Sequence, residues 1–283
     1  EIITKHFTDV PIEVSKDIQG CEESNKRERE SEQQVAQFKP HRHLFRLSIN
    51  TANACNLRCV YCYANHGQYG EEKNSLMKLE DIDQTLNRFA KHYDLISHIQ
   101  FMGGEPSLHP LAIQKTYDVC RSLVAAGKFK DMPRLCMVSN GVHFTKEFWE
   151  TVKKTKCSIT FSLDGPKPIH DAIRPQPSGQ GSFDALVANI HHAKDIGLSV
   201  NYEATFTKKH LEEGLNLIGL CQWFFDEFGQ RILHAPPMGI NKYCADNKLG
   251  LTQAEKAREY CAASDWGLGN LLKGQYLMAS FTD

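Results

Sequence analysis

The chain has 283 residues, of which 41% are hydrophobic, so it can form one large α/β domain or two smaller ones. Its 33 Lys and Arg residues nearly match its 34 Asp and Glu residues, and this balance gives no general attraction to nucleic acid or to an anionic membrane. No apolar run approaches the ~20 residues that cross a bilayer, and nothing resembles a signal peptide, which predicts a cytoplasmic protein.

The first 43 residues differ in composition from the rest of the chain. Residues 15–34 are polar and charged, which predicts a linker or a poorly packed helix. Because residue 1 is Glu rather than Met, we expect a fragment or a processed product. We predict an N-terminal extension or linker at 1–43, an α/β core at 44–240 and the start of a C-terminal extension at 241–283.

Six apolar segments have the composition of strands, and helical patterns lie between them. The strands are predicted at residues 45–52, 98–104, 134–140, 157–165, 199–206 and 231–235. Apolar residues recur at helical spacing in between, as at Leu79, Ile82 and Leu86. This alternation predicts an α/β fold with a parallel sheet, curled or open. A last helix is expected from Thr252, which has capping-box spacing to Glu255.

Three of the ten cysteines lie together just after the first predicted strand. Cys55, Cys59 and Cys62 have the spacing C-x3-C-x2-C. Three thiolates on one short loop can hold three irons of a [4Fe–4S] cluster and leave the fourth iron open to a substrate or cofactor. Zinc with His66 as a fourth ligand is the alternative, although structural zinc sites usually have two ligand pairs. The many cysteines in a long chain favour a reducing compartment.

Two further motifs follow the second and third predicted strands. Sites in parallel α/β folds lie at this carboxyl edge of the sheet. After the second strand, Gly103 and Gly104 permit close backbone approach to a ligand, and Glu105 can accept a hydrogen bond from an ammonium group. After the third strand, Ser139 and Asn140 can meet ribose hydroxyls, or they can form an ordinary Asn-Gly turn.

Polar residues also mark the fourth and fifth predicted strands. Ser162 ends the fourth strand, and Arg174 lies shortly after it. A hydroxyl and a guanidinium can together bind a carboxylate. On the fifth strand, Glu203 lies in an otherwise apolar stretch, where an unpaired carboxylate is costly. It either serves a site or lies on the outward face beside a helix.

The cysteine loop, with the motifs after it, resembles the signature of the radical S-adenosylmethionine superfamily over roughly residues 44–235. The resemblance implies a partial (β/α)6 TIM-type barrel, a [4Fe–4S] cluster on Cys55, Cys59 and Cys62, and S-adenosylmethionine on the open iron. That cofactor is cleaved reductively to a 5′-deoxyadenosyl radical, which abstracts hydrogen from the substrate.

The same resemblance assigns contacts to the cofactor. The Gly103-Gly104-Glu105 motif is implied to bind the methionine amino group, and Ser162 with Arg174 its carboxylate. The ring of Tyr61 is implied to lie near adenine, in a pocket that Leu233 and His234 also line. Glu203 is implied to orient the cofactor or touch the substrate, and we group it with the cluster cysteines as catalytic.

Four longer stretches resemble the peptide- and protein-modifying branch of this superfamily. They are YANHGQYG after Cys62, SLDGPKPIHDAIRP, GQGSFD and EATFTKKH. The branch includes ribosomal-peptide thioether maturases and anaerobic sulfatase maturases. It implies a precursor peptide as substrate and an electron donor such as flavodoxin or ferredoxin. The alternatives are a formylglycine-generating sulfatase maturase, a peptide epimerase and, in another class, a metal or iron–sulfur binding protein without catalysis.

The other cysteines carry less information. Cys120, Cys136, Cys157 and Cys221 lie in apolar patterns and are expected in the core. Members of the branch often have a C-terminal SPASM-type extension with auxiliary [4Fe–4S] clusters, marked by dense cysteine pairs. The sequence has no such pairs before residue 283, and we do not assign Cys244 or Cys261 as auxiliary ligands.

Overall fold

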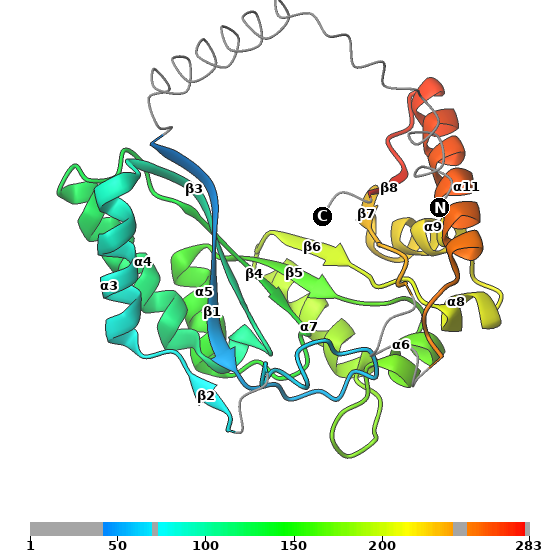
Figure 1. The fold of residues 1–283 in the computed structure, drawn as a ribbon, viewed down its shortest axis with the longest axis horizontal. Helices are drawn as coiled ribbons and strands as arrows, with labels where there is room; N and C mark the ends of the chain where they lie inside the picture. Colours follow the sequence, from blue (N-terminus) through cyan, green and yellow to red (C-terminus); the bar gives the residue numbers. More distant parts are fainter. Residues whose placement is uncertain (1–41, 70–72, 240–247, 281–283) are drawn as a thin grey trace, which may run out of the picture. The chain divides into compact units, whose positions relative to one another are not determined.

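The computed structural model describes residues 42–69, 73–239 and 248–280 (Figure 1). Within these ranges the strands are β1 (His43–Asn53), β2 (Ser75–Leu76), β3 (Leu95–Gly103), β4 (Arg134–Ser139), β5 (Ser158–Ser162), β6 (Val200–Glu203), β7 (Ile232–His234) and β8 (Met278–Ser280). The helices are α3 (Leu79–His92), α4 (Pro110–Ala125), α5 (Lys146–Thr155), α6 (Lys167–Ile173), α7 (Phe183–Asp195), α8 (Lys208–Glu212), α9 (Leu217–Phe228) and α11 (Gln253–Leu272), with a 3-10 turn, η1, at Pro106–Leu108.

The described strands form one sheet in the order β2-β1-β3-β4-β5-β6-β7-β8. Neighbouring strands are parallel throughout, apart from the antiparallel pair of β1 and β2. All six predicted strands are present, so the predicted parallel α/β fold is confirmed. Strands β2 and β8, of two and three residues, were not predicted. Strand β7 is equally short, but it was predicted as part of a five-residue segment, residues 231–235.

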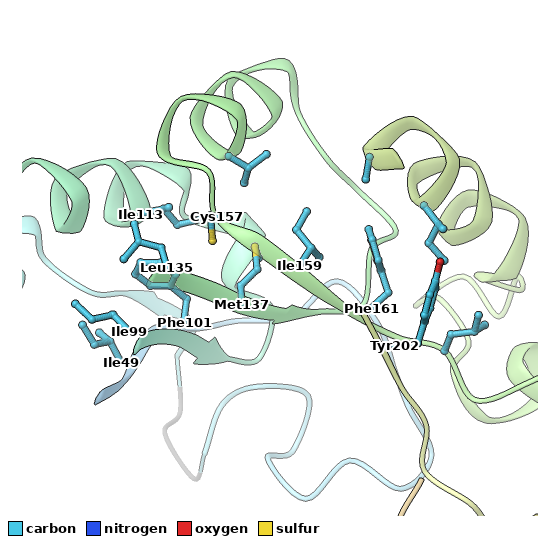
Figure 2. Close-up of a cluster of buried hydrophobic side chains, with 14 of the residues drawn as sticks. Ile49, Ile99, Phe101, Ile113, Leu135, Met137, Cys157, Ile159, Phe161 and Tyr202 are labelled. Carbon is cyan, nitrogen blue, oxygen red and sulfur yellow. The ribbon is translucent and has the colours of Figure 1, made fainter. Parts of the chain in front are cut away.

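A layer of apolar side chains joins the sheet to the helices α3, α4, α5 and α7. Successive strand residues face opposite sides, so Ile99 and Phe101 of β3 point to the same side as Met137 of β4. Figure 2 shows these residues beside Ile159 and Phe161 of β5, beneath the helices. Full burial of each side chain contributes about 1.5–3 kcal/mol. This layer fixes the sheet and determines which strand residues face the opposite side.

The opposite, inner face of the sheet is polar. Gln100 of β3 and Ser158 of β5 both pair in register with Cys136 of β4, and Thr160 pairs with Asn201 of β6. These side chains alternate with the buried apolar ones and are half-buried or exposed. The inner face therefore presents hydrogen-bonding groups on neighbouring strands.

The last described helix begins as predicted. The Thr252 hydroxyl accepts from the Glu255 N–H, while the Glu255 carboxylate accepts from the Thr252 N–H, which completes a capping box. After this helix, α11, strand β8 adds to the sheet beside β7. Most of the predicted extension at 1–43 lies outside the described residues, and the domain boundaries stay predictions. No described helix is long and apolar enough to cross a bilayer.

Candidate active site

The cysteine loop follows β1 and is anchored at two places on the carboxyl edge of the sheet. The Arg58 N–H donates to the carbonyl of Pro175, just beyond α6, at 2.8 Å. Nearer the start of the loop, the Ala54 carbonyl accepts from the N–H of Glu105, just beyond β3, at 2.9 Å. Segments that follow two other strands therefore hold the loop in place.

Gly103 and Gly104 let the cysteine loop pack against the end of β3. Gly103 has φ +140°, and a Cβ there would lie 2.5 Å from the Ala52 carbonyl oxygen. A Cβ on Gly104 would lie 2.6 Å from the Gly67 Cα and nearer still to the Ala54 carbonyl oxygen. We expected these glycines to admit a ligand. They line the cavity, but the close approach that requires them is that of the loop backbone.

We predict that Gly104→Ala displaces the cysteine loop. The added methyl group meets backbone atoms rather than flexible side chains, and such overpacking typically costs about 1–3 kcal/mol. Iron bound after anaerobic reconstitution should fall several-fold, and the melting temperature should drop. Gly269→Ala is the matched control, because a Cβ there meets nothing within 4 Å. Equal iron content in the two variants would contradict this account of Gly104.

The three thiols of the loop line one cavity of about 450 Å³. Burial raises the pKa of Cys55 to about 12 and that of Cys59 to about 11, so both thiols are neutral near pH 7 unless a positive centre stabilises the thiolates. The N–H groups of Leu57 and His66 point at the sulfurs of Cys55 and Cys62, at 3.5 and 3.2 Å. Half-buried thiols that line one cavity and have N–H donors fit an iron–sulfur cluster.

The zinc alternative required His66 as a fourth ligand. In residues 42–69, 73–239 and 248–280, no three His, Cys, Asp or Glu side chains are placed to hold a single metal ion. The Nδ1 atom of His66 is buried and has no hydrogen-bond partner there. The arrangement of the described residues thus offers no ready mononuclear site.

Glu105 joins the ends of β3 and β4. Its Oε1 atom accepts from the Ser107 N–H at 3.0 Å and from the Ser139 hydroxyl at 2.7 Å, and its Oε2 atom accepts from the Asn140 N–H at 2.7 Å. Burial raises the pKa of Glu105, and these hydrogen bonds oppose the rise. Ser139 also accepts from the Gly141 N–H at 3.0 Å. The Glu105 carboxylate and the Ser139 hydroxyl therefore form hydrogen bonds within the protein. Their expected contacts with a cofactor stay predictions.

Arg174 lies between the cysteine loop and the end of β5. Its Nε–H donates to the Asp164 Oδ2 atom at 2.6 Å, and its guanidinium lies 5.3 Å from the centre of the Tyr61 ring. The Tyr61 hydroxyl donates to the same Asp164 oxygen at 2.6 Å. Arg174, Tyr61 and Ser162 all line the cavity, which is compatible with the expected carboxylate and adenine contacts. Those contacts remain predictions.

Asp164 is the residue of the site that we did not assign from the sequence. It is fully buried, and besides Arg174 and Tyr61 it accepts from the Thr205 N–H at 2.9 Å. Its backbone carbonyl lies 2.5 Å from the His210 Nε2 atom. Burial alone would raise the pKa of Asp164, but the charges of Arg174 and His170 and the hydrogen bonds from Arg174 and Tyr61 together outweigh burial and hold that pKa below its usual value. The signal was an aspartate inside the SLDGP motif, next to Ser162.

Glu203 faces the cavity rather than an outer helix. The Ser162 hydroxyl donates to its Oε1 atom at 3.1 Å, and burial raises its pKa while Arg174 opposes the rise. His234 pairs in register with Glu203, so both lie on the inner face. Leu233 alternates to the other face and packs in the hydrophobic core, so the expectation that it lines the pocket is not supported.

The remaining cysteines differ in exposure. Cys120, Cys157 and Cys221 are buried in the core as expected, whereas Cys136 is half-buried on the inner face. Cys261 is exposed, and Cys244 lies outside the described residues. Auxiliary clusters stay a prediction about a longer C-terminal extension.

A parallel α/β sheet that gathers three thiols and a set of polar groups around one cavity at its carboxyl edge defines a class of iron–sulfur enzymes with a bound small cofactor. Residues 49–215, more than half of the chain, match the Radical SAM superfamily, and the chain belongs to this family. It is accordingly an enzyme that uses a [4Fe–4S] cluster and S-adenosylmethionine, in a partial TIM-type barrel.

Named relatives carry out several reactions. The chain is 27% identical over 191 residues to the serine-type anaerobic sulfatase-maturating enzyme of Bacteroides thetaiotaomicron, which covers 65% of this chain and 44% of that protein. It is 26% identical over 160 residues to a GTP 3',8-cyclase of Vibrio vulnificus, and this match covers 56% of this chain and 44% of that protein. A solved structure of anSMEcpe with bound AdoMet and Cp18Cys peptide is similar in fold, with a TM-score of 0.66, 18% identity, and coverage of 84% and 63%. The chain thus spans less than two thirds of each of these proteins.

Proposed function

We propose that the enzyme abstracts a hydrogen atom from a peptide substrate and thereby matures a ribosomally synthesised peptide, through a thioether or another crosslink. The precursor peptide is the partner, and flavodoxin or ferredoxin supplies the electron. When bound, the cluster and S-adenosylmethionine supply the 5′-deoxyadenosyl radical.

One observation carries the peptide proposal. The cavity beside the cysteines lies at one edge of the inner sheet face, where Gln100, Ser158 and Asn201 on different strands are half-buried or exposed. Amide and hydroxyl side chains both donate and accept hydrogen bonds, which matches the alternating N–H and C=O groups of an extended peptide. The sulfatase-maturating relative and the peptide-bound structural neighbour support the same substrate class.

The chain's own residues divide the work at the site. Cys55, Cys59 and Cys62 would hold the cluster. Arg174 and Ser162 would hold the cofactor carboxylate, because a guanidinium and a hydroxyl on adjoining segments face the same cavity. Glu203 is half-buried and lines the cavity, and its carboxylate would accept a hydrogen bond from the substrate or the cofactor.

A sulfatase-type maturase is the second candidate, and the 27% identical relative favours it. Such an enzyme oxidises one Ser or Cys of a protein to formylglycine and leaves the peptide uncrosslinked. A peptide epimerase would leave the mass of its substrate unchanged. A crosslink and the oxidation of Ser to formylglycine each remove two hydrogen atoms, so reaction with an aldehyde reagent distinguishes these two products. An epimer is recognised by its unchanged mass and altered stereochemistry.

The test uses reconstituted enzyme, S-adenosylmethionine and dithionite, with small peptides encoded beside its gene as substrates. Precursor peptides are often encoded next to their maturase. We expect 5′-deoxyadenosine to form together with a peptide that has lost a pair of hydrogen atoms and does not react with an aldehyde reagent. A sulfatase-derived Ser or Cys peptide and GTP are the comparison substrates. Turnover of GTP, with none of either kind of peptide, would contradict the proposal.

A further inference from the structure

Every sulfur of the cysteine loop has an N–H group pointing at it, and two of these groups come from outside the loop. The Asn140 side-chain amide, after β4, donates to the Cys55 sulfur at 3.8 Å. The Arg174 guanidinium, after α6, donates from Nη1 to the Cys59 sulfur at 4.0 Å. Cys62 receives its donor from a backbone N–H of the loop itself. The sulfurs of Cys55 and Cys59 therefore each accept a hydrogen bond from a side chain, and a point substitution can remove that donor.

Other contacts hold both donors in place. Arg174 is only 8% exposed, and its Nε–H is committed to the Asp164 carboxylate, which leaves Nη1 directed at Cys59. Asn140 is 7% exposed, and its Oδ1 atom accepts from the Val142 N–H at 3.1 Å. Side chains fixed in this way keep their orientation toward the sulfurs at little entropic cost.

These two donors affect how easily an iron–sulfur group bound by the sulfurs takes up negative charge. Reduction adds one electron, hence one negative charge, to the iron–sulfur group, and a nearby N–H or guanidinium stabilises that charge. The Arg174 Nη1 atom lies 4.0 Å from the Cys59 sulfur, so its positive charge favours negative charge on this sulfur. The guanidinium carries a full charge, so its effect should exceed that of the neutral amide.

We propose that Asn140 and Arg174 raise the reduction potential of the cluster through the sulfurs of Cys55 and Cys59. This role is separate from any contact that either residue makes with S-adenosylmethionine. It is also independent of the substrate, so it stands whether or not the enzyme acts on a peptide.

The experiment measures the midpoint potential of the reconstituted cluster without S-adenosylmethionine, by potentiometric titration followed by electron paramagnetic resonance. The variant Asp164→Asn/Arg174→Met removes the guanidinium together with the charge of its partner. At a potential where half of the wild-type cluster is reduced, we expect its ratio of reduced to oxidised cluster to fall about tenfold, about 59 mV for one electron. For Asn140→Leu we expect a smaller fall, of about two- to threefold. Arg134→Met, which removes an exposed cation at the other end of β4, is the matched control.

The outcomes are distinct. Wild-type potentials in both variants, with weakened binding of S-adenosylmethionine, would show that these residues contact only the cofactor and would overturn the proposal. If the double variant binds no iron, the variant Asn140→Asp tests the proposal instead. It places a carboxylate beside Cys55 in a side chain of nearly the same size. Its potential must then fall below that of Asn140→Leu, and an unchanged potential would again overturn the proposal.

Discussion

Cys59→Ala protein should bind almost no cluster and form no detectable 5′-deoxyadenosine from S-adenosylmethionine and dithionite. Among the residues that the structure describes, only three thiols line the cavity, so one substitution removes a third of these ligands. Loss of an outer contact to a metal ligand typically costs 10–100-fold in affinity or activity, and loss of the ligand itself should exceed about 100-fold. Iron and sulfide content, the absorbance lost on reduction, and chromatography of the nucleoside products all measure this effect.

Cys136→Ala is the control for this prediction. Cys136 is half-buried on the inner face, and its thiol donates to the Ile99 carbonyl at 3.6 Å, away from the loop. This variant should keep wild-type iron content. A Cys59→Ala protein that still forms 5′-deoxyadenosine at more than about one hundredth of the wild-type rate would show that Cys59 is not an essential ligand.

Features within one stretch of sequence were predicted well. The spacing of Cys55, Cys59 and Cys62 placed three thiols on one loop, and the capping box at Thr252 placed the start of α11. Both depend on residues a few positions apart, where the chain geometry leaves little freedom. The six predicted strands lie in apolar segments of five to nine residues, whereas β2 and β8 were not predicted.

Features that join distant segments were not predicted. Gly104 supports the loop because Ala54 and Gly67 fold back against it, and only the tertiary structure brings these residues together. Leu233 was expected in the pocket, but the pairing of Glu203 with His234 turns it to the opposite face. In a strand the register determines which residues face a site, and a shift of one position reverses the assignment.

The Asp164–Arg174 ion pair is the clearest case, and it supports a large expected effect on stability. Arg174 was predicted as a cofactor contact, yet its Nε–H is held by a carboxylate that is fully buried. Asp164→Ala would leave the guanidinium buried without its partner, and breaking a buried pair in this way costs about 3–5 kcal/mol. For a domain of this size, each 1 kcal/mol lowers the melting temperature by about 2–4 °C, so a fall of roughly 10 °C is expected.

Two variants test whether the charge of Asp164 or its shape matters. Asp164→Asn keeps an acceptor for the Thr205 N–H but loses the charge, so it should lose most of the same stability. Glu150→Gln removes the exposed pair of Glu150 with Lys146, at 3.8 Å, and should cost at most about 1 kcal/mol. If Asp164→Asn and the wild type have the same melting temperature at pH 7, the ion pair contributes nothing to stability and Asp164 acts only through hydrogen bonds.

The pH dependence supplies an independent check on the same pair. The pKa of Asp164 is held below its usual value in the folded protein, so its contribution is fully present above the unfolded pKa of about 3.9. That contribution is lost as the pH falls toward and through the folded pKa, because the unfolded chain then binds the proton more readily. Urea unfolding should thus separate wild type from Asp164→Asn by a constant amount from pH 5 to 7 and by less in stronger acid. A difference that stays constant down to about pH 2 would mean that Asp164 is not ionised in the native protein.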